Sequence, residues 1–330
     1  MRIDAHTHFI PQKYFDEVQR HEGLLSYEIE NGGSDKPLVR IGKFHFFASR
    51  EHRDPEAQVR RMEEKGIDLQ VISTHTYLYH YADPPDVALE LARIVNEELA
   101  GVVLAYPGRF AAKGTVPLQD PEAACGELHR ARGELGIRAF EIGSSVDGIP
   151  LDHPSLRSFF AEAEKLEVFI SVHPYSGWLL AQDYLEFAYL KNLTGIPMNT
   201  AWAIGRLIFS GILEEFPRLK LGFSHGGGVA PFLLGRWDHG WEERPECRGR
   251  LSIPPSEAFR RLYFDTITHD PHALELVLSW VPPSHLLLGS DYPFDMGPSD
   301  PAEAVESARG LSLEDQEGIF CGNAKEVLGL

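Results

Sequence analysis

Short apolar runs alternate with longer amphipathic stretches along most of the chain. Eight of the apolar runs have the length and the β-branched content of buried strands. Most of the helical stretches between them open with proline, a common first residue of helices. This alternation predicts an α/β fold, a (β/α)8 or TIM barrel, formed by one domain over residues 1–330. The predicted strands are 3–6, 69–73, 112–116, 137–142, 168–172, 219–223, 262–264 and 286–289. The predicted helices include 55–64, 84–100, 121–135, 154–165 and 271–278.

Two segments interrupt this pattern. Residues 9–54 are the least regular part of the chain, with a possible hairpin around 31–35, and residues 174–200 form a second long connection. We interpret them as insertions after strands one and five. Both follow the carboxyl ends of strands, where barrel enzymes build their active sites. The tail from Leu311 onward is predicted to be a closing helix.

Charge and cysteine content narrow the functional classes. The formal net charge of −18 disfavours nucleic acid and anionic membranes as partners, because like charges repel. The three cysteines, Cys125, Cys247 and Cys321, form no C-x-x-C pair, which indicates a reducing compartment. The amino-terminal residues lack the apolar core of a signal peptide, and no apolar run is long enough to span a bilayer. We therefore expect a cytoplasmic protein.

Histidines close several of the predicted strands. His6 and His8 lie two residues apart at the end of the first strand, so their side chains share one face. About one such pair is expected by chance from composition, so this pair alone fits a metal site and two polar residues at a strand end equally well. His173 ends strand five before Pro174, where a packing role is the simpler interpretation.

Two further strand ends carry polar side chains. His225 follows strand six and precedes three glycines, which permit a sharp turn or a close approach to a ligand. Asp291 follows strand eight and is a metal ligand, a base or a helix cap. All these strand ends meet at one face of a barrel. Imidazole and carboxylate together suit zinc, and also manganese, iron or cobalt. Three histidines and one aspartate would leave a coordination position for water.

The motifs resemble those of a known family. IDAHTHFIP, SVHP, SHGGGVAPFLLGR and LLLGSDYPFDMG occur in an order that is similar to the amidohydrolase superfamily. Within it, the chain resembles the decarboxylase branch typified by α-amino-β-carboxymuconate-ε-semialdehyde decarboxylase (ACMSD). The resemblance covers nearly the whole chain. It is highly specific for this branch and less specific for one substrate.

The resemblance implies roles for individual residues. It implies that His6, His8, His173 and Asp291 bind one divalent metal, most often zinc. It gives His225 the acid–base role, in which Asp291 also takes part. It implies a homodimer in which Arg236 reaches the neighbouring active site and holds a substrate carboxylate. Strand four, IRAFEIG, lacks the lysine that bridges two metals in other members of the superfamily, so one metal is expected.

Other positions depart from the family pattern or stay open. The family's second arginine falls at Arg50 or Arg53, and an aromatic position in the second insertion falls at Asn192, with Trp178 and Trp202 nearby. These departures put the ACMSD substrate in doubt. His75 follows strand two and either lines the pocket or makes a loop hydrogen bond. Asp265 is a candidate partner for a metal-ligating histidine, although backbone pairing is simpler.

These patterns predict a non-oxidative decarboxylase that acts on a small aromatic or unsaturated carboxylic acid. The same metal, water and histidine also serve hydrolases of amides, lactones or esters, and hydratases. A non-catalytic metal protein is a further alternative. Structural zinc sites are usually closed and rich in cysteine, and no cysteine joins this set.

Overall fold

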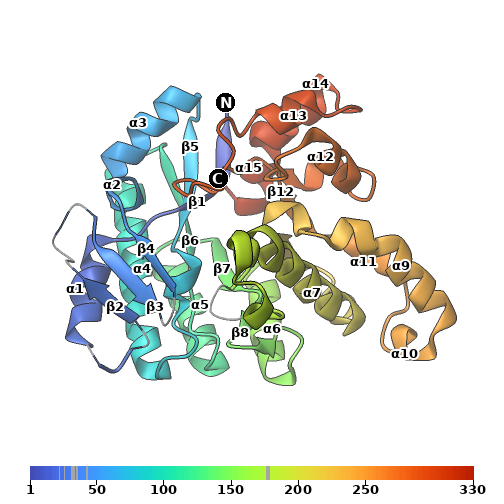
Figure 1. The fold of residues 1–330 in the computed structure, drawn as a ribbon, viewed down its shortest axis with the longest axis horizontal. Helices are drawn as coiled ribbons and strands as arrows, with labels where there is room; N and C mark the ends of the chain where they lie inside the picture. Colours follow the sequence, from blue (N-terminus) through green and yellow to red (C-terminus); the bar gives the residue numbers. More distant parts are fainter. Residues whose placement is uncertain (22, 26, 31–33, 35, 42–43, 176–178) are drawn as a thin grey trace.

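The computed structural model describes residues 1–330 except residues 22, 26, 31–33, 35, 42–43 and 176–178. Eight parallel strands pair in the order β1-β5-β6-β7-β10-β11-β12-β13. Hydrogen bonds from Ala5 N to Leu288 O and from His8 N to Tyr292 O join the first strand to the end of the last. The predicted barrel is therefore confirmed (Figure 1). The barrel strands are β1 (Ile3–His8), β5 (Leu69–Ser73), β6 (Phe110–Gly114), β7 (Ala139–Gly143), β10 (Phe169–His173), β11 (Lys220–Phe223), β12 (Tyr263–Asp265) and β13 (Leu286–Leu287).

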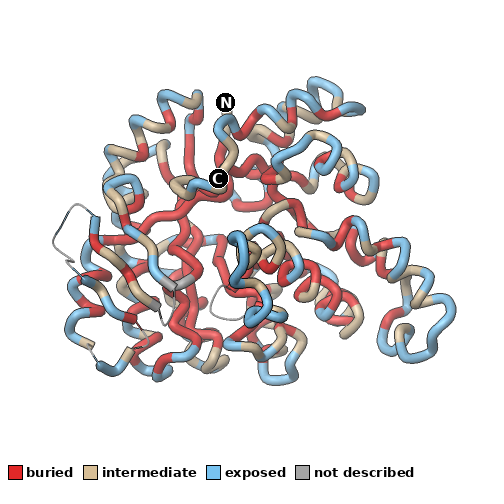
Figure 2. Tube along the Cα trace, viewed as in Figure 1, coloured by how far each residue is buried: buried red, intermediate tan, exposed pale blue. Residues whose placement is uncertain are grey.

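Helices between the strands cover the barrel, and the strands are its most buried part (Figure 2). Three of these helices begin with a proline that directly follows an aspartate. The side chains of Asp54, Asp120 and Asp270 cap these helices, since each accepts the backbone N–H of the residue two positions further on. No helix among the described residues is long and apolar enough to cross a bilayer. The main helices are α3 (Pro55–Lys65), α4 (Pro85–Ala105), α5 (Pro121–Glu134), α6 (Arg157–Lys165), α7 (Ile196–Phe209), α9 (Ala230–Glu243), α11 (Pro255–Phe259), α12 (Pro271–Leu278), α13 (Glu303–Ser307), α14 (Leu313–Glu317) and α15 (Asn323–Leu328).

The third barrel strand lies two residues earlier than the sequence predicts. It spans Phe110–Gly114 rather than 112–116. Thr115 N donates to the side-chain Oδ1 of Asn96, at 2.8 Å, and not to a neighbouring strand. A polar side chain on α4 therefore ends the ladder, which the apolar pattern of one segment does not reveal.

The first insertion adds a small antiparallel sheet beside the barrel. It contains α1 (Gln12–Arg20), the strands β2 (Tyr27–Glu30), β3 (Leu38–Ile41) and β4 (Phe44–Phe47), and α2 (Arg50–Arg53). β2 and β3 pair antiparallel on either side of the predicted hairpin, whose residues 31–33 and 35 lie outside the described part of the chain. A buried chain of hydrogen bonds anchors the insertion, because Tyr14 donates to His80 Nε2 and His80 Nδ1 donates to Asp83.

The two ends of the barrel differ. At the amino-terminal end of the strands, Ala324, Val327 and Leu328 of α15 pack against Ile3 and Leu69, which agrees with the predicted closing helix. At the other end, the described part of the second insertion contains the short helical turns Gln182–Tyr184, Phe187–Tyr189 and Lys191–Gly195, after which α7 begins at Ile196. The carboxyl ends of the strands are thus left to form a site.

Candidate active site

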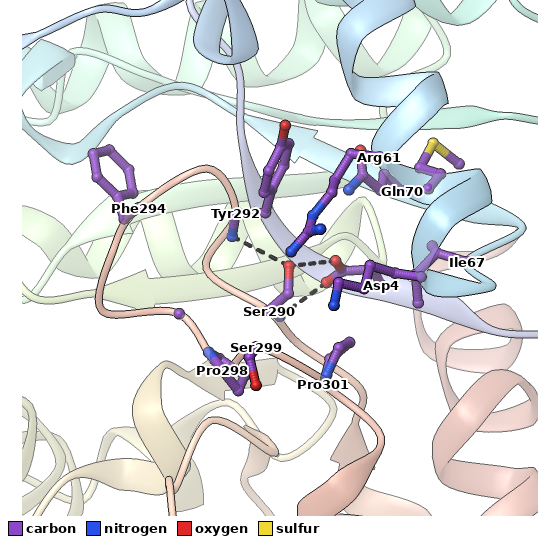
Figure 3. Close-up of a pocket in the computed structure, with 13 residues that line it drawn as sticks. Asp4, Arg61, Ile67, Gln70, Ser290, Tyr292, Phe294, Pro298, Ser299 and Pro301 are labelled. Carbon is purple, nitrogen blue, oxygen red and sulfur yellow. Dashed lines mark hydrogen bonds between the residues drawn. The ribbon is translucent and has the colours of Figure 1, made fainter.

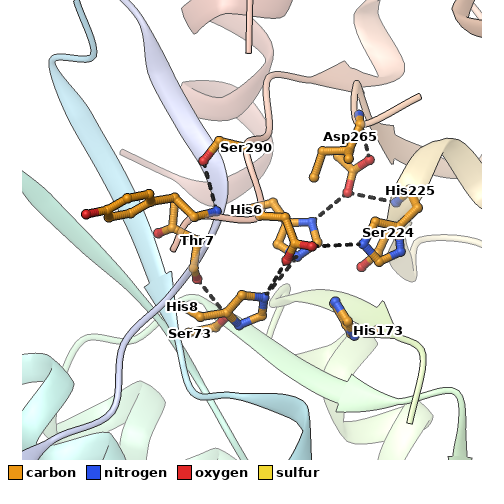
Figure 4. A network of polar contacts seen from close by, with 12 residues as sticks. His6, Thr7, His8, Ser73, His173, Ser224, His225, Asp265 and Ser290 are labelled. Carbon is orange, nitrogen blue, oxygen red and sulfur yellow. Dashed lines mark hydrogen bonds and ion pairs between the residues drawn. The ribbon is translucent and has the colours of Figure 1, made fainter. Parts of the chain in front are cut away.

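The carboxyl ends of four barrel strands bring the predicted site residues together (Figure 4). His6 and His8 come from β1, His173 ends β10, His225 follows β11, and Asp291 follows β13. The ring centroid of His6 lies 5.1 Å from those of both His8 and His173, and the centroid of His173 lies 5.1 Å from that of His225. Parallel strands in a closed barrel end at one face, so residues more than 280 positions apart become neighbours.

The donor atoms have the spacing of a metal site. One ligand atom each from His6, His173, His225 and Asp291 lies within 4.8 Å of the others. The Nε2 atom of His8 lies 3.2 Å from His6 Nε2 and 3.0 Å from Asp291 Oδ1. The structure therefore gathers all five predicted residues. It offers both His8 and His225 beside the other three donors, so the assignment of ligand and acid–base roles stays a prediction.

Hydrogen bonds to Nδ1 orient three of the imidazoles. His6 Nδ1 lies 2.6 Å from Asp265 Oδ2, His8 Nδ1 lies 3.2 Å from the carbonyl of Thr74, and His173 Nδ1 lies 3.1 Å from the carbonyl of Pro174. An imidazole that donates through Nδ1 keeps a lone pair on Nε2.

The Nε2 atoms are left for a cation. His173 Nε2 is buried without a hydrogen-bond partner in the described structure, and the Nε2 atoms of His6 and His8 face each other. Buried acceptors that meet without a donor fit a bound divalent metal.

The charges of the site agree with this fit. Burial lowers the pKa of His173 well below its ordinary value, and the nearby His6 adds to the effect. Burial opposes ionisation of Asp291, but its polar contacts with His225 and His8 outweigh burial and hold the pKa of this carboxyl well below its usual range. A neutral imidazole beside an ionised carboxylate is the donor set that a divalent cation prefers.

His225 differs from His173 in the direction of its pKa shift. Burial opposes the charged form of His225, but the contact with the Asp291 carboxylate and the charge of that carboxylate outweigh burial and raise its pKa. The distance from His225 Nε2 to Asp291 Oδ2 is 3.6 Å. A raised pKa favours the protonated imidazole, which is the form that an acid catalyst needs.

Both of these residues adopt strained backbone conformations. The φ angles of His225 and Asp291 are +56° and +57°, a region that costs about 1–3 kcal/mol for such residues. After His225 the backbone turns at Gly228, where a Cβ atom would lie 2.2 Å from the carbonyl oxygen of Pro197 on α7. The glycines thus serve a sharp turn packed against a neighbouring helix. The strain at two converging site residues supports a functional role for both.

A cavity of about 680 Å³ opens above these residues. Its floor contains His8, His173, His225 and Asp291, and its walls are largely apolar. This volume is typical of sites for small organic ligands. The apolar wall includes Phe46, Leu193, Ile196, Pro197, Val229, Phe232, Ile267, Leu276, Val277, Phe294 and Met296.

Comparison with known proteins agrees with this geometry. The family model described as amidohydrolase matches residues 3–330. A 2-amino-3-carboxymuconate-6-semialdehyde decarboxylase from Dictyostelium discoideum is 34% identical over 100% of this chain and 92% of that protein. The chain belongs to the amidohydrolase family. The resemblance in the sequence motifs is thereby confirmed.

Solved structures show the same fold. A 5-carboxyvanillate decarboxylase from Sphingomonas paucimobilis superimposes with a TM-score of 0.83 at 23% identity, covering 100% of this chain and 99% of that one. A manganese-bound dihydroxybenzoic acid decarboxylase from Polaromonas has a TM-score of 0.78 at 22% identity, covering 100% and 97%.

Asp265 connects two members of the amidohydrolase site. Its Oδ2 accepts from His6 Nδ1 at 2.6 Å and from the backbone N–H of His225 at 2.9 Å, while its Oδ1 accepts from Gly226 N and Ile267 N. The simpler interpretation of Asp265, backbone pairing alone, is therefore incomplete. The side chain also fixes the ring of a predicted metal ligand.

Replacing Asp265 with asparagine is expected to weaken metal binding about 10- to 100-fold. The amide nitrogen of asparagine would face N–H donors on whichever side it points, because both carboxylate oxygens accept hydrogen bonds. Competition with a chromophoric chelator measures the change. Asp270→Asn, at the exposed cap of α12, is the control and should leave the affinity unchanged. Equal affinities for the two variants would contradict the role of Asp265.

Some of the predicted substrate residues line the cavity and others do not. His75 lines the cavity and stacks on Phe46, with ring centroids 4.7 Å apart. Asn192 also lines it. Arg50 pairs with Asp54 at 2.6 Å, and Arg53 donates to Gln12 and to the carbonyl of Ser34, so neither is among the residues that line the cavity.

Arg236 and the two tryptophans lie elsewhere. Arg236 is exposed on α9 and is not among the lining residues. Trp202 lines an exterior groove between α7 and α9, and Trp178 lies outside the described residues. In this single chain, no lysine or arginine is among the described residues that line the cavity.

Sequence reasoning did not single out several of the aromatic residues at the site. His45 and Phe46 reach the cavity from β4 of the first insertion. Phe294 lies against His8, His75 and the buried His52, with ring centroids 4.5–5.2 Å apart. The alternation in FHFF is a visible signal for a strand. Nothing in it shows that this strand borders the cavity.

Proposed function

We propose that this protein is a metal-dependent, non-oxidative decarboxylase of a small aromatic or unsaturated carboxylic acid. The observation that carries the proposal is the convergence of buried, lone-pair-bearing Nε2 atoms and the Asp291 carboxylate on the floor of a largely apolar cavity. The full-length similarity to a decarboxylase of the same family supports it. Apolar walls suit a ring or a conjugated chain.

His6, His8, His173 and Asp291 would hold one divalent metal, with zinc the first choice and manganese, iron or cobalt as alternatives. Such an ion would supply Lewis-acid stabilisation of negative charge on the substrate. The manganese found in a structural neighbour supports a metal of this class. The three unpaired cysteines support a reducing, cytoplasmic location.

His225 is the proposed proton donor. It lines the cavity beside Asp291, and its raised pKa favours the protonated form. A proton passes from His225 to the carbon that bears the carboxylate. The bond from this carbon to the carboxylate carbon then breaks, its electron pair restores the conjugated system, and CO₂ leaves. Asp291 stabilises the charged imidazole before the transfer.

The test combines metal analysis with CO₂ release from a panel of aromatic and muconate-type acids. We expect about one divalent metal per chain and CO₂ evolution from at least one acid. One metal without CO₂ from any acid would reject the decarboxylase. It would favour the hydrolase or hydratase that the same site could serve, for which lactones and amides are the next substrates. A protein that binds no metal after loading would reject the metal site.

We also propose a homodimer in which Arg236 enters the partner's active site. Phe232 and Arg236 lie one turn apart on one face of α9. Phe232 is 80% exposed although it lines the cavity. An exterior apolar groove of about 560 Å³, with Trp202, Leu233 and Trp237 in its lining, lies beside this face. Apolar surface of this kind suits a protein interface.

Replacing Arg236 with glutamine is expected to raise KM about 10- to 100-fold, because a charge-assisted hydrogen bond to a carboxylate contributes about 1.5–3 kcal/mol. Steady-state kinetics measure the change. Arg244→Gln, next to the carboxyl end of α9 and paired with Glu246, is the control and should not change KM.

A mixing experiment tests the subunit origin of the arginine. Arg236→Gln and His225→Gln are each expected to be impaired alone. If Arg236 acts in the partner's site, mixed dimers contain one intact site and activity returns on mixing. No return of activity in dimers shown to be mixed would contradict the proposal.

A further inference from the structure

A buried carboxyl group, that of Asp4 on β1, lies close to two of the predicted metal ligands in the chain and contacts Ser290 (Figure 3). Asp4 is only 1% exposed. Its Oδ1 accepts the backbone N–H of Ser290 at 3.1 Å and that of His6 at 3.3 Å, and its Oδ2 accepts the hydroxyl of Ser290. Ser290 Oγ in turn accepts the N–H of Tyr292 at 3.1 Å.

These bonds link the two ends of the chain. Asp4 and Ser290 are 286 positions apart, and each is next to or near a predicted ligand: His6 follows Asp4 by two residues, and Asp291 follows Ser290. The backbone of His6 also accepts the N–H of Asp291, at 2.9 Å. One carboxylate therefore holds the backbone of His6 and that of Ser290, the residue before Asp291.

The position of Asp4 in β1 adds a second effect. The register between β1 and β5 shifts between Asp4 and Thr7, so β1 contains one extra residue there. A bulge of this kind redirects the side chains that follow it. The bond from His6 N to Asp4 closes this bulge. Asp4 thus helps to set the direction in which His6 points.

Burying this carboxylate is costly without a counter-charge. The described residues include no ion pair to Asp4, although Arg61 and Lys65 line a small cavity of about 100 Å³ beside it. Its acceptors are used by backbone and hydroxyl donors only. A buried carboxyl group whose hydrogen bonds go to two ligand-bearing segments indicates a positioning role.

We propose that Asp4, acting through Ser290 and the backbone of His6, is a positioning residue that sets the affinity and geometry of the metal centre. It does not contact the metal. The proposal rests on the proposed metal site but not on the decarboxylase activity. It therefore makes a prediction about metal binding that holds whatever the substrate is.

The experiment measures Co²⁺ binding and the visible absorption of the Co²⁺-loaded protein, which reports ligand geometry. Asp4→Ala is expected to weaken Co²⁺ binding about 10- to 100-fold and to change the absorption spectrum. Ser290→Ala removes one link and keeps the backbone bond, so a smaller loss in the same direction is expected. Asp4 acts partly through Ser290. The fold loss of Co²⁺ affinity in the double variant should therefore be smaller than the product of the losses in the two single variants.

Glu127→Ala is the matched control. Glu127 is a fully buried carboxylate on α5 that accepts from Asn96 and Arg130, away from the metal site. Its loss should lower the Tm and leave Co²⁺ affinity and spectrum unchanged. If Asp4→Ala behaves in the same way, Asp4 is a structural residue and the proposal is overturned.

Three further outcomes test the role of Asp4, the metal site and the decarboxylase activity separately. Should Asp4→Ala fail to fold, unchanged Co²⁺ affinity and spectrum in Ser290→Ala would overturn the proposal. A wild-type protein that binds no Co²⁺ rejects both the metal site and the role of Asp4. A wild-type protein that binds Co²⁺ but releases no CO₂ rejects the decarboxylase alone.

Discussion

Replacing His173 with alanine is expected to remove the bound metal and, with it, all measurable turnover. His173 Nε2 is buried without a hydrogen-bond partner in the described structure, so a metal is the partner that this atom fits. Structural zinc sites bind with roughly 10–16 kcal/mol in total. On that scale an equal share for one ligand in four is about 2.5–4 kcal/mol, or about 10²- to 10³-fold in affinity.

Metal content after gel filtration and thermal unfolding measure this effect. Added metal should raise the Tm of the wild-type protein and not that of the variant, because only a bound ligand stabilises the folded state. His285→Ala is the control, since His285 stacks on Tyr263 and hydrogen-bonds to Leu262 at the opposite end of the barrel. Full metal content in His173→Ala would show that the ligand set is wrong.

Replacing His225 with glutamine is expected to lower kcat about 10²- to 10⁴-fold while the metal is retained. The four predicted ligands stay in place, and the proton donor is lost. In the wild-type protein the nearby Asp291 carboxylate raises the pKa of His225 against the effect of burial. The protonated form is present below this pKa and is lost as the pH rises through it, so activity should fall on the alkaline side.

The pH–rate profile separates catalysis from structure. The alkaline fall should be absent from the residual activity of His225→Gln, because the group that titrates is gone. His272→Gln, at an exposed position on α12, should keep both kcat and the profile. Unchanged kcat in His225→Gln, or loss of the metal from this variant, would refute the acid–base role.

The local pattern of apolar and polar residues was enough to predict most of the fold and the residues at the centre of the site. Apolar strands followed by helices that open with proline predicted the barrel, and the polar residues after strands one, five, six and eight predicted the convergence of His6, His173, His225 and Asp291. This inference succeeds because a parallel barrel places every strand end at one face, so a one-dimensional position becomes a three-dimensional one.

The tertiary structure alone decided what surrounds these residues. Arg50 and Arg53 are candidates for substrate binding, and in the structure their side chains contact Asp54, Gln12 and Ser34 and are not among the residues that line the cavity. His45 and Phe46 reach the cavity because a small sheet folds beside the barrel. The directions of these side chains depend on contacts between distant segments, which sequence periodicity does not encode.

The hydrogen bonds that Asp265 and Asp4 make near the predicted ligands also separate what the sequence predicts from what only the fold shows. The sequence by itself determined that His6 and Asp291 end two strands of one barrel. Only the folded chain brings Asp265 to His6 Nδ1 and Asp4 to Ser290, across 259 and 286 positions. A hydrogen bond needs its two atoms within a few tenths of an ångström of the right distance. Strand spacing and packing set that distance, and the order of residues along the chain does not.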